Sequence, residues 1–222
     1  TMAISTGNIV CRLSESGSDE YGRWAYHTYA GRNQRALNFI TAYQVCAKAP
    51  NQRGKITAAA QQESLLRQKK VKDPNPRKHF RKDLSTFLRK LQSMKHEILL
   101  LGDFNEELGE EETGMSKICS DFQLTDLMTH THGVMDVATY SRGKKRLDYA
   151  LGTEKVLESL RFCGYEPFYH RMFSDHHSYF LDFDTLLLFG SDTPAIPAMA
   201  FRDIQSKCPK QVTTYLKGLH AN

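Results

Sequence analysis

The chain has 222 residues, of which 40% are hydrophobic and 25% charged, and its formal net charge is +5. This composition is ordinary for a globular protein with a substantial core, and the mild basic excess suits binding to a polyanion without requiring it. It excludes a membrane-spanning helix, because no apolar run approaches the about 20 residues that a span needs.

The cysteines and the first residues indicate where the protein works. The five cysteines are scattered and form no Cys-x-x-Cys pair, which argues against a disulfide framework or a zinc knuckle. Residues 1–3 do not start a basic segment followed by an apolar one, so no secretory signal is visible. We therefore expect an intracellular protein, in the nucleus or the cytoplasm, that is not bound to a membrane.

The order of the predicted elements indicates an α/β protein, with the strands crowded early and late in the chain. In chain order, the predicted elements are strands at 8–13, 23–29 and 36–45, helices at 56–68 and 80–94, and a strand at 97–101. Polar turns are predicted at 14–22 and 31–33. The second helix is the clearest element, because its apolar residues recur at helical spacing. The last strand is a continuous apolar run, typical of a strand buried on both faces.

The second half is predicted to hold shorter elements around polar loops. In chain order, they are an acidic loop at 106–112, a helix at 116–122, a hairpin of 139–140 and 146–151 around the basic turn 141–145, and a strand at 179–183. A linker follows Gly190, and residues 211–219 form a predicted helix. These features predict one domain over 1–188, followed by a linker and short C-terminal helix over 189–222.

Three short polar clusters lie at or near the ends of predicted strands: Gly-Asp-Phe-Asn at 102–105, Arg-Leu-Asp-Tyr at 146–149 and Ser-Asp-His at 174–176. In the first cluster, Asp103 and Asn105 are two residues apart and are expected to project from one face of a strand. A carboxylate beside an amide can hold a water molecule and accept its proton. The alternative is an Asx turn, which is a common device at strand ends.

The other two clusters leave their pairing open. Asp148 lies in an apolar strand and needs a partner, because an unpaired buried charge is costly. That partner is either Arg146, in a structural ion pair, or a histidine whose pKa it would raise. Of the two adjacent histidines, His176 and His177, the first follows Asp175, a carboxylate that can bind a divalent cation. The alternative for the third cluster is a set of polar residues on a loop.

A basic run surrounds the break between the two predicted helices. It comprises Arg67, Lys69, Lys70, Lys72, Arg77, Lys78, Arg81 and Lys82. Such a run can contact a nucleic-acid backbone and release its counterions, or it can be a solvated helix face. The sequence leaves both interpretations open.

In this order, the three clusters resemble the endonuclease/exonuclease/phosphatase superfamily, which includes apurinic endonucleases, DNase I and the target-nicking domains of LINE-type retrotransposons. Residues 40–43 (Ile-Thr-Ala-Tyr) are similar to the family strand that ends in a phosphate-contacting tyrosine. The resemblance covers residues 8–184, and 75–105 look most like retroelement-type members. It implies a DNase I-like α/β sandwich of mixed and antiparallel sheets flanked by helices, and a metal-dependent DNA endonuclease.

The resemblance also implies a role for each matching residue. Asp103 would position and deprotonate the attacking water, and Asn105 would hold both Asp103 and the phosphate. Tyr43 would contact the scissile phosphate. Asp148 would orient His176, which would stabilise the charge that develops on phosphorus. The implied partner is DNA, and the implied cofactor is Mg²⁺ or Mn²⁺ with Asp175 as a metal ligand.

Two features depart from the family pattern. Cys46 stands where an asparagine often follows the tyrosine by three residues. In the family, one strand with an asparagine and another with a metal-binding glutamate precede the tyrosine strand, but only 42 residues precede Tyr43. We therefore expect a domain without its N-terminal strands, and a weak or inactive nuclease for lack of a metal ligand. Two other functions stay open: a non-catalytic fragment or pseudoenzyme that binds nucleic acid, and a phosphatase of the same superfamily.

Overall fold

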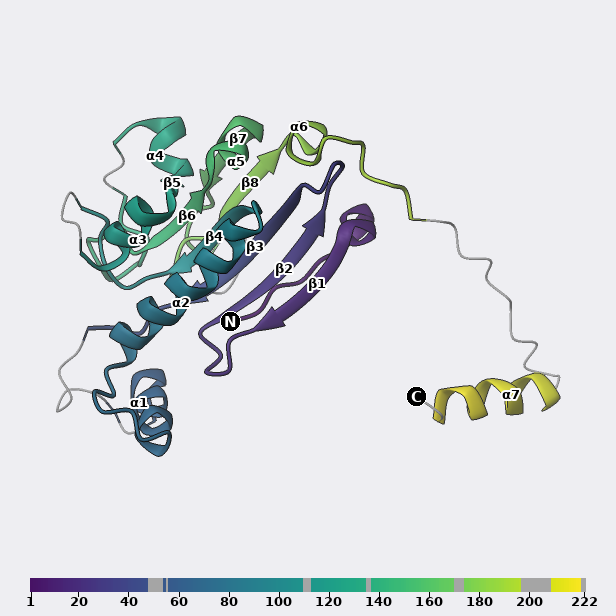
Figure 1. Cartoon of the computed structure of the whole chain (residues 1–222), viewed down its shortest axis with the longest axis horizontal. Coiled ribbons are helices and arrows are strands. Elements are labelled where there is room, and N and C mark those ends of the chain that lie inside the picture. The colour runs from purple at the N-terminus through teal and green to yellow at the C-terminus, as the bar shows by residue number, and fades with distance from the viewer. Residues whose placement is uncertain are drawn as a thin grey trace.

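A six-stranded mixed sheet forms the centre of the molecule, with helices on both faces and a two-stranded sheet on one of them (Figure 1). The computed structural model describes residues 1–47, 54, 56–109, 113–134, 137–169, 174–196 and 209–220. The strands are β1 (Leu13–Ser18), β2 (Trp24–Ala30), β3 (Ala36–Tyr43), β4 (Glu97–Asp103), β5 (Thr125–Asp126), β6 (Asp148–Gly152), β7 (Leu160–Tyr165) and β8 (Tyr179–Phe183). The helices are η1 (Gly7–Arg12), α1 (Ala58–Gln68), α2 (Pro76–Ser93), α3 (Gly114–Phe122), α4 (Leu127–His132), α5 (Glu154–Ser159), α6 (Thr185–Phe189) and α7 (Pro209–His220).

Strand β4 lies inside the six-stranded sheet, whose order is β1-β2-β3-β4-β6-β5. It pairs in parallel with β3 and antiparallel with β6. Alternate residues of β4 enter two cores. Ile98 and Leu100 pack with α2 and α3, while Leu99 and Leu101 pack with α6 and the inner face of β7 and β8. All four side chains are buried, which confirms the prediction of a strand covered on both faces.

Helix α2 confirms the second predicted helix and covers one face of the sheet (Figure 1). The side chain of Asn75 caps its first turn by accepting a hydrogen bond from the N–H of Lys78, and Pro76 occupies the first helical position. The apolar residues that the helix buries against the sheet are Phe80, Leu84, Leu88 and Leu91. Their helical spacing is the signal that made this element predictable.

The N-terminal prediction is wrong in its placement. Most of 8–13, the predicted strand, forms the 3-10 helix η1, and the predicted turn at 14–22 contains β1. Strand β1 lies at the edge of the sheet beside β2, and most of its side chains are exposed. An edge strand with a solvated face is held by main-chain hydrogen bonds, so its sequence needs no apolar alternation. Because this edge sequence is polar, its pattern predicts a turn rather than a strand.

The predicted hairpin around the basic turn 141–145 is only partly present. Strand β6 pairs with β4 and β5, while Tyr140 forms a β-bridge with His176. This bridge brings the third polar cluster against the second. The sequence pattern also missed α5 and β7. Helix α7 contains the helix predicted at 211–219, whereas part of the predicted acidic loop lies outside the described residues.

No helix in the described ranges is long and apolar enough to cross a membrane. The core lies on the two faces of the central sheet, where the buried apolar residues form two clusters. Both clusters include residues of β4.

Gly102 allows β3 and β4 to approach closely just before the first polar cluster. A Cβ atom at this position would lie 1.9 Å from the carbonyl oxygen of Ala42 on the neighbouring strand. Main-chain atoms held in a sheet cannot move aside as a flexible side chain can, so only glycine fits here.

We expect Gly102→Ala to lower the free energy of unfolding by about 2 kcal/mol or more, because the strands must separate to admit the methyl group. Urea unfolding followed by circular dichroism measures this change. Gly109→Ala is the control, since nothing described lies within 4 Å of a Cβ atom placed there. Equal stability of the two variants would contradict the close approach.

Candidate active site

The ends of three adjacent strands place predicted site residues in one row. In the parallel pair β3–β4, Tyr43 is the partner of Asp103, and in the antiparallel pair β4–β6, Asp103 is the partner of Asp148. Directly opposed residues of neighbouring strands project from the same face of a sheet. Side chains from three separate stretches of sequence therefore meet at one end of the sheet.

His176 joins this row through Asp148. Its Nδ1 lies 2.9 Å from Oδ2 of Asp148, and the bridge between His176 and Tyr140 holds its main chain. Burial lowers the pKa of His176, but the hydrogen bond and charge of Asp148, with Asp103 and Asp175, outweigh it, so the pKa is raised overall. Asp148 itself is only 7% exposed, whereas the side chain of His176 is 30% exposed, so solvent reaches the pair from the histidine side.

The structure decides the pairing that the sequence left open. Arg146 does not take Asp148 as its partner; it forms a two-pronged ion pair with Asp126, with Nη2 at 2.8 Å from Oδ1. The second histidine, His177, contacts the main-chain carbonyl of Glu166 through Nδ1 at 2.6 Å. His176 is therefore the imidazole that faces the carboxylates. The Arg146–Asp126 pair was not predicted, and nothing in the local sequence signals it.

In the first cluster, the Asx-turn interpretation and the carboxylate–amide interpretation both describe the structure. Strand β4 ends at Asp103, and Asn105 has a left-handed backbone with φ of 49°. The main-chain N–H of Asn105 donates to Oδ1 of Asp103 at 2.9 Å, and its side-chain Nδ2 donates to Oδ2 at 3.0 Å. Phe104, which lies between these two residues in the sequence, is fully buried. The turn itself thus holds the carboxylate with two donors.

Tyr43 and Cys46 lie beside this turn. The thiol of Cys46 contacts Oδ1 of Asn105 at 3.0 Å, and Nδ2 of Asn105 donates to the main-chain carbonyl of Gln44 at 2.8 Å. Burial raises the pKa of Tyr43, and nearby Cys46 and Asp103 add to this effect. The phenol therefore stays protonated over the neutral range. Cys46, noted as a departure from the family pattern, contacts the amide at the site.

Asp103, Asp148 and His176 form a group that could hold a metal ion, since one donor atom from each lies within 4.8 Å of the others. Oxygen ligands of this kind suit Mg²⁺ or Mn²⁺. The pKa of Asp103 is raised to about 6, first by burial and then by the charge of Asp148. A divalent cation between the two carboxylates would relieve this repulsion. The residues present therefore fit such an ion.

Asp175, the metal ligand expected from the resemblance, lies next to this group in sequence but has a different partner. Its Oδ2 accepts from Nη2 of Arg142 at 2.9 Å, and its side chain is 41% exposed. Its charge still contributes to the raised pKa of His176. Its role as a metal ligand stays a prediction.

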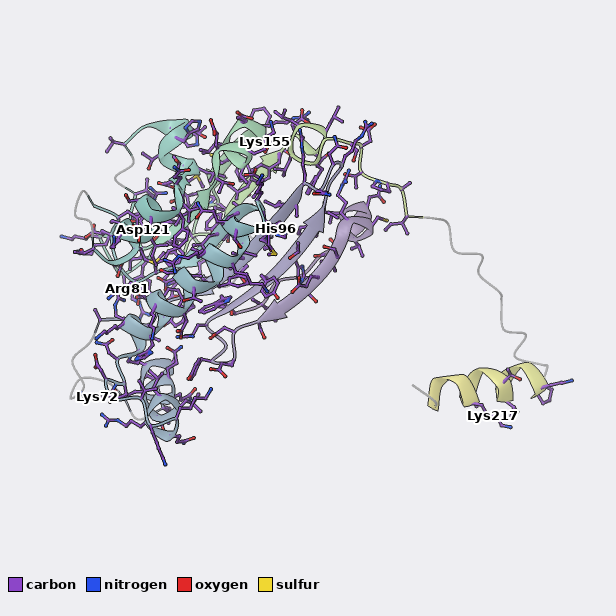
Figure 2. The ribbon with its side chains drawn as sticks, in the orientation of Figure 1. Lys72, Arg81, His96, Asp121, Lys155 and Lys217 are labelled. Atoms are coloured by element: carbon purple, nitrogen blue, oxygen red, sulfur yellow. The ribbon has the colours of Figure 1, made fainter. Side chains whose placement is uncertain are left out.

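Five of the eight residues in the basic run form ion pairs within the protein, in two groups. Arg67, Lys69 and Lys78 form ion pairs with the acidic side chains of Glu63, Glu20 and Asp73. Arg77 and Arg81 instead point inward to Glu106. Figure 2 shows Lys72 beside α1 at the outer end of the molecule, away from the sheet, and Arg81 on α2. Much of this charge is thus matched by carboxylates within the protein.

Comparison with known proteins bears on the fold. No protein-family model matches the sequence, and no curated protein matches it at a significant level. The structure is similar to that of AP endonuclease LMAP from Leishmania major, with a TM-score of 0.53 and 14% identity, over 75% of this chain and 56% of that chain.

Two further structures are similar. One is the 3' phosphatase NExo from Neisseria bound to a product DNA hairpin (TM-score 0.49, 18% identity, 77% of this chain and 70% of that chain). The other is an endonuclease/exonuclease/phosphatase family protein from Leptotrichia buccalis (TM-score 0.40, 16% identity, 72% of this chain and 53% of that chain).

The likeness to the Leishmania structure concerns the fold, because the identity is low. The chain shares the DNase I-like α/β fold of that structure, with a six-stranded mixed sheet flanked by helices. This confirms the expected fold class. The chain spans 56% of the length of the Leishmania protein. The expected lack of N-terminal strands stays a prediction.

We expect Asp103 to titrate with a pKa of about 6 in the metal-free protein. Asp148→Asn should lower the pKa of His176, because the imidazolium loses the carboxylate that stabilises it. NMR titration of the side chains measures both values, with Asp103→Asn identifying the signal of that carboxyl group. An ordinary pKa for Asp103, or an unchanged His176 in Asp148→Asn, would contradict the geometry.

Proposed function

We propose that this chain is a divalent-metal-dependent phosphodiester hydrolase. The observation that supports this most strongly is the convergence of Asp103, Asp148 and His176, whose donor atoms lie within 4.8 Å of one another. Hydrolysis of a phosphodiester needs a base for water, positive charge near the phosphoryl oxygens and an oriented acid or charge stabiliser. This group of side chains, with Asn105 and Tyr43 beside it, can meet each of these needs.

Asp103 is the proposed base. In the metal-free protein its pKa is about 6, so it is mostly ionised at neutral pH and can accept a proton. Asn105 donates to both of its oxygens and so limits its rotation. A water molecule held by this pair would lose its proton to Asp103 as its oxygen attacks phosphorus; the bond from phosphorus to the leaving ester oxygen would break, and that oxygen would take a proton from solvent.

His176 is the proposed charge stabiliser, and Asp148 orients it. Because Nδ1 is bonded to Asp148, the imidazole presents Nε2 to the phosphate. Its raised pKa favours the imidazolium form, which stabilises negative charge on the phosphoryl oxygens. Tyr43 stays protonated because burial raises its pKa, and it is the proposed hydrogen-bond donor to the same phosphate.

The residues that would hold Mg²⁺ or Mn²⁺ are Asp103 and Asp148, with Asp175 as the further ligand that the sequence predicts. When bound, the cation supplies positive charge to the phosphoryl oxygens and the leaving group. The chain's own contribution is to hold the two carboxylates in cross-strand register, so that they face each other before the ion arrives.

The finer proposal is a DNA endonuclease of the type that retroelements encode. A net charge of +5 suits a polyanionic substrate, and the Leishmania protein of similar fold is an AP endonuclease. The retroelement type is supported by the sequence resemblance over residues 75–105 alone.

With Mg²⁺ present, we expect the chain to convert supercoiled plasmid to its nicked form only slowly, in keeping with the expected lack of a metal ligand, as measured by gel electrophoresis. Asp103→Asn or His176→Ala should each slow this by about 100-fold or more, because each removes a group that transfers a proton or stabilises charge. His177→Gln is the matched control and should retain the wild-type rate.

Two results would contradict this proposal. Nicking that survives both Asp103→Asn and His176→Ala would arise from another site or a contaminant. Salt-sensitive DNA binding without any nicking would favour the non-catalytic alternative.

The cation site can be tested without any assay of activity. Mg²⁺ or Mn²⁺ should raise the melting temperature of the wild-type chain, because a ligand that binds the folded state stabilises it. The variant carrying both Asp103→Asn and Asp148→Asn should show no such rise in a thermal-shift measurement. In parallel, EDTA should abolish nicking. Equal melting shifts in the two proteins would place the cation elsewhere.

A further inference from the structure

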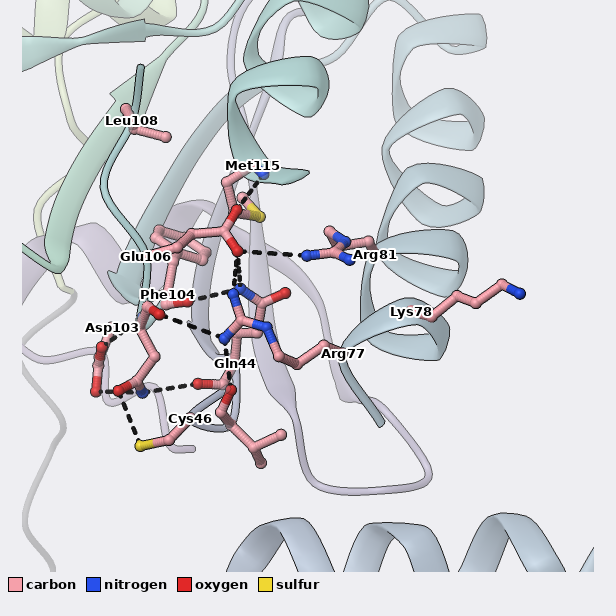
Figure 3. A network of polar contacts seen from close by, with 12 residues as sticks. Gln44, Cys46, Arg77, Lys78, Arg81, Asp103, Phe104, Glu106, Leu108 and Met115 are labelled. Carbon is pink, nitrogen blue, oxygen red and sulfur yellow. Dashed lines mark hydrogen bonds and ion pairs between the residues drawn. The ribbon is translucent and has the colours of Figure 1, made fainter. Parts of the chain in front are cut away.

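Glu106 is a largely buried carboxylate directly behind the turn that follows β4 (Figure 3). Its Oε2 accepts hydrogen bonds from Arg77 and Arg81, which lie on α2. The same oxygen accepts from the side-chain amide of Gln44 at 3.0 Å, just after β3, while Oε1 accepts from the main-chain N–H of Met115 in the first turn of α3. One side chain therefore ties the turn to the end of β3 and to two helices.

Arg77 connects this carboxylate to the turn itself. Its guanidinium donates to the carbonyl oxygen of Val45 at 2.6 Å and to that of Asn105 at 3.3 Å, in addition to Glu106. A guanidinium presents its donors in a rigid planar fork, so it holds the three acceptors in one arrangement. By contrast, Lys78, the next residue of α2, points away from the network (Figure 3).

Gln44 forms a second link to the same turn. Its main-chain N–H donates to the carbonyl of Asp103 at 2.9 Å, and its Nε2 donates to the carbonyl of Phe104 at 2.6 Å. Its own main-chain carbonyl accepts from Nδ2 of Asn105 at 2.8 Å. Because Gln44 is fully buried, water does not compete for these bonds. Each carbonyl from Asp103 to Asn105 thus has a partner within the network.

Stability alone does not account for this arrangement. Burial lowers the pKa of Arg77, and the attraction of Glu106 does not fully offset this effect. A buried ion pair is often no more stabilising than well-packed apolar residues in its place. Apolar residues would join α2 to the sheet, but they would leave the carbonyls of Val45 and Asn105 without partners. What the ion pair adds is a fixed position for the turn.

We propose that Arg77 and Glu106 are positioning residues for the hydrolysis. They hold the main chain of Asn105, and the side chain of Asn105 in turn holds the carboxylate of Asp103. This inference rests on the proposed role of Asp103. Arg77 and Glu106 act through Asn105, so their removal should disturb the rate more than the binding of substrate.

The test compares Arg77→Lys and Glu106→Gln with two matched controls, Arg23→Lys and Asp83→Asn. Arg23, just before β2, forms an ion pair with Asp83 of α2, with Nη2 and Oδ2 2.8 Å apart; the Arg23 side chain is only 3% exposed and that of Asp83 is 37% exposed. The other partner of Arg23 is Asp19, in the preceding turn. The controls therefore make the same chemical changes in an ion pair with a buried arginine, away from the turn after β4.

Two measurements are made on each variant: kcat and KM for plasmid nicking with Mg²⁺, and the side-chain amide resonances of Asn105 in ¹⁵N NMR spectra. The resonances are assigned by their loss in Asn105→Asp. We expect Arg77→Lys and Glu106→Gln to lower kcat by about 10- to 100-fold with KM little changed, since a small misplacement of a reacting group can cost about 100-fold. Both variants should also shift the Asn105 resonances, whereas the two controls should change neither measurement.

Unchanged kcat and unchanged Asn105 resonances in Arg77→Lys and Glu106→Gln would overturn the proposal. Equal changes in the controls would also overturn it, because they would show a general loss of structure. A wild-type chain without hydrolysis would overturn the proposed function instead. In that case, the Asn105 resonances still decide whether Arg77 and Glu106 hold the turn.

Discussion

The pairing of β4 with β3 on one side and with β6 on the other is the constraint on which the site depends. The two registers place Asp103 opposite Tyr43 and opposite Asp148. A slip of one residue would turn these side chains to the other face of the sheet. The apolar residues of β4 resist such a slip, because they must enter the two cores in alternation, and Gly102 fits only where it meets Ala42. The apolar interior thus positions the polar end of the strand.

That polar end contains a repulsion that its own side chains do not remove. Asp103 and Asp148 face each other, and burial together with this charge raises the pKa of Asp103 to about 6. His176 balances only part of the negative charge. Arg146, the cation nearest to Asp148 in sequence, is held by Asp126 instead. Had Arg146 paired with Asp148, the attraction of the site for a divalent cation would be much weaker. Because Asp126 binds this arginine, the negative charge of Asp103 and Asp148 stays available to a cation.

Helix α2 shows how arginine and lysine divide two tasks within one basic segment. Arg77 and Arg81 turn inward, where a weakly hydrated planar group can satisfy a carboxylate and main-chain carbonyls together. Lys78 stays outside, where its strongly hydrated ammonium pairs with Asp73. A count of basic residues therefore overstates the charge that this helix can offer to a nucleic acid. Such a count also does not reveal that Arg77 and Arg81 bind Glu106, behind the turn after β4.

Local pattern alone was sufficient for α2 and for β4, whereas Asp103, Asn105, Asp148 and His176 were singled out by the resemblance of three short clusters to a known family. Periodic burial leaves a signal in a helix or a buried strand, and polar residues at the ends of apolar runs are conspicuous. The same reasoning failed for β1, whose polar edge sequence carries no such signal. Only the tertiary structure decided that Asp148 pairs with His176 rather than Arg146, and that Arg77 and Glu106 lie behind the turn. These choices depend on distances between segments far apart in the chain, and no local pattern encodes those distances.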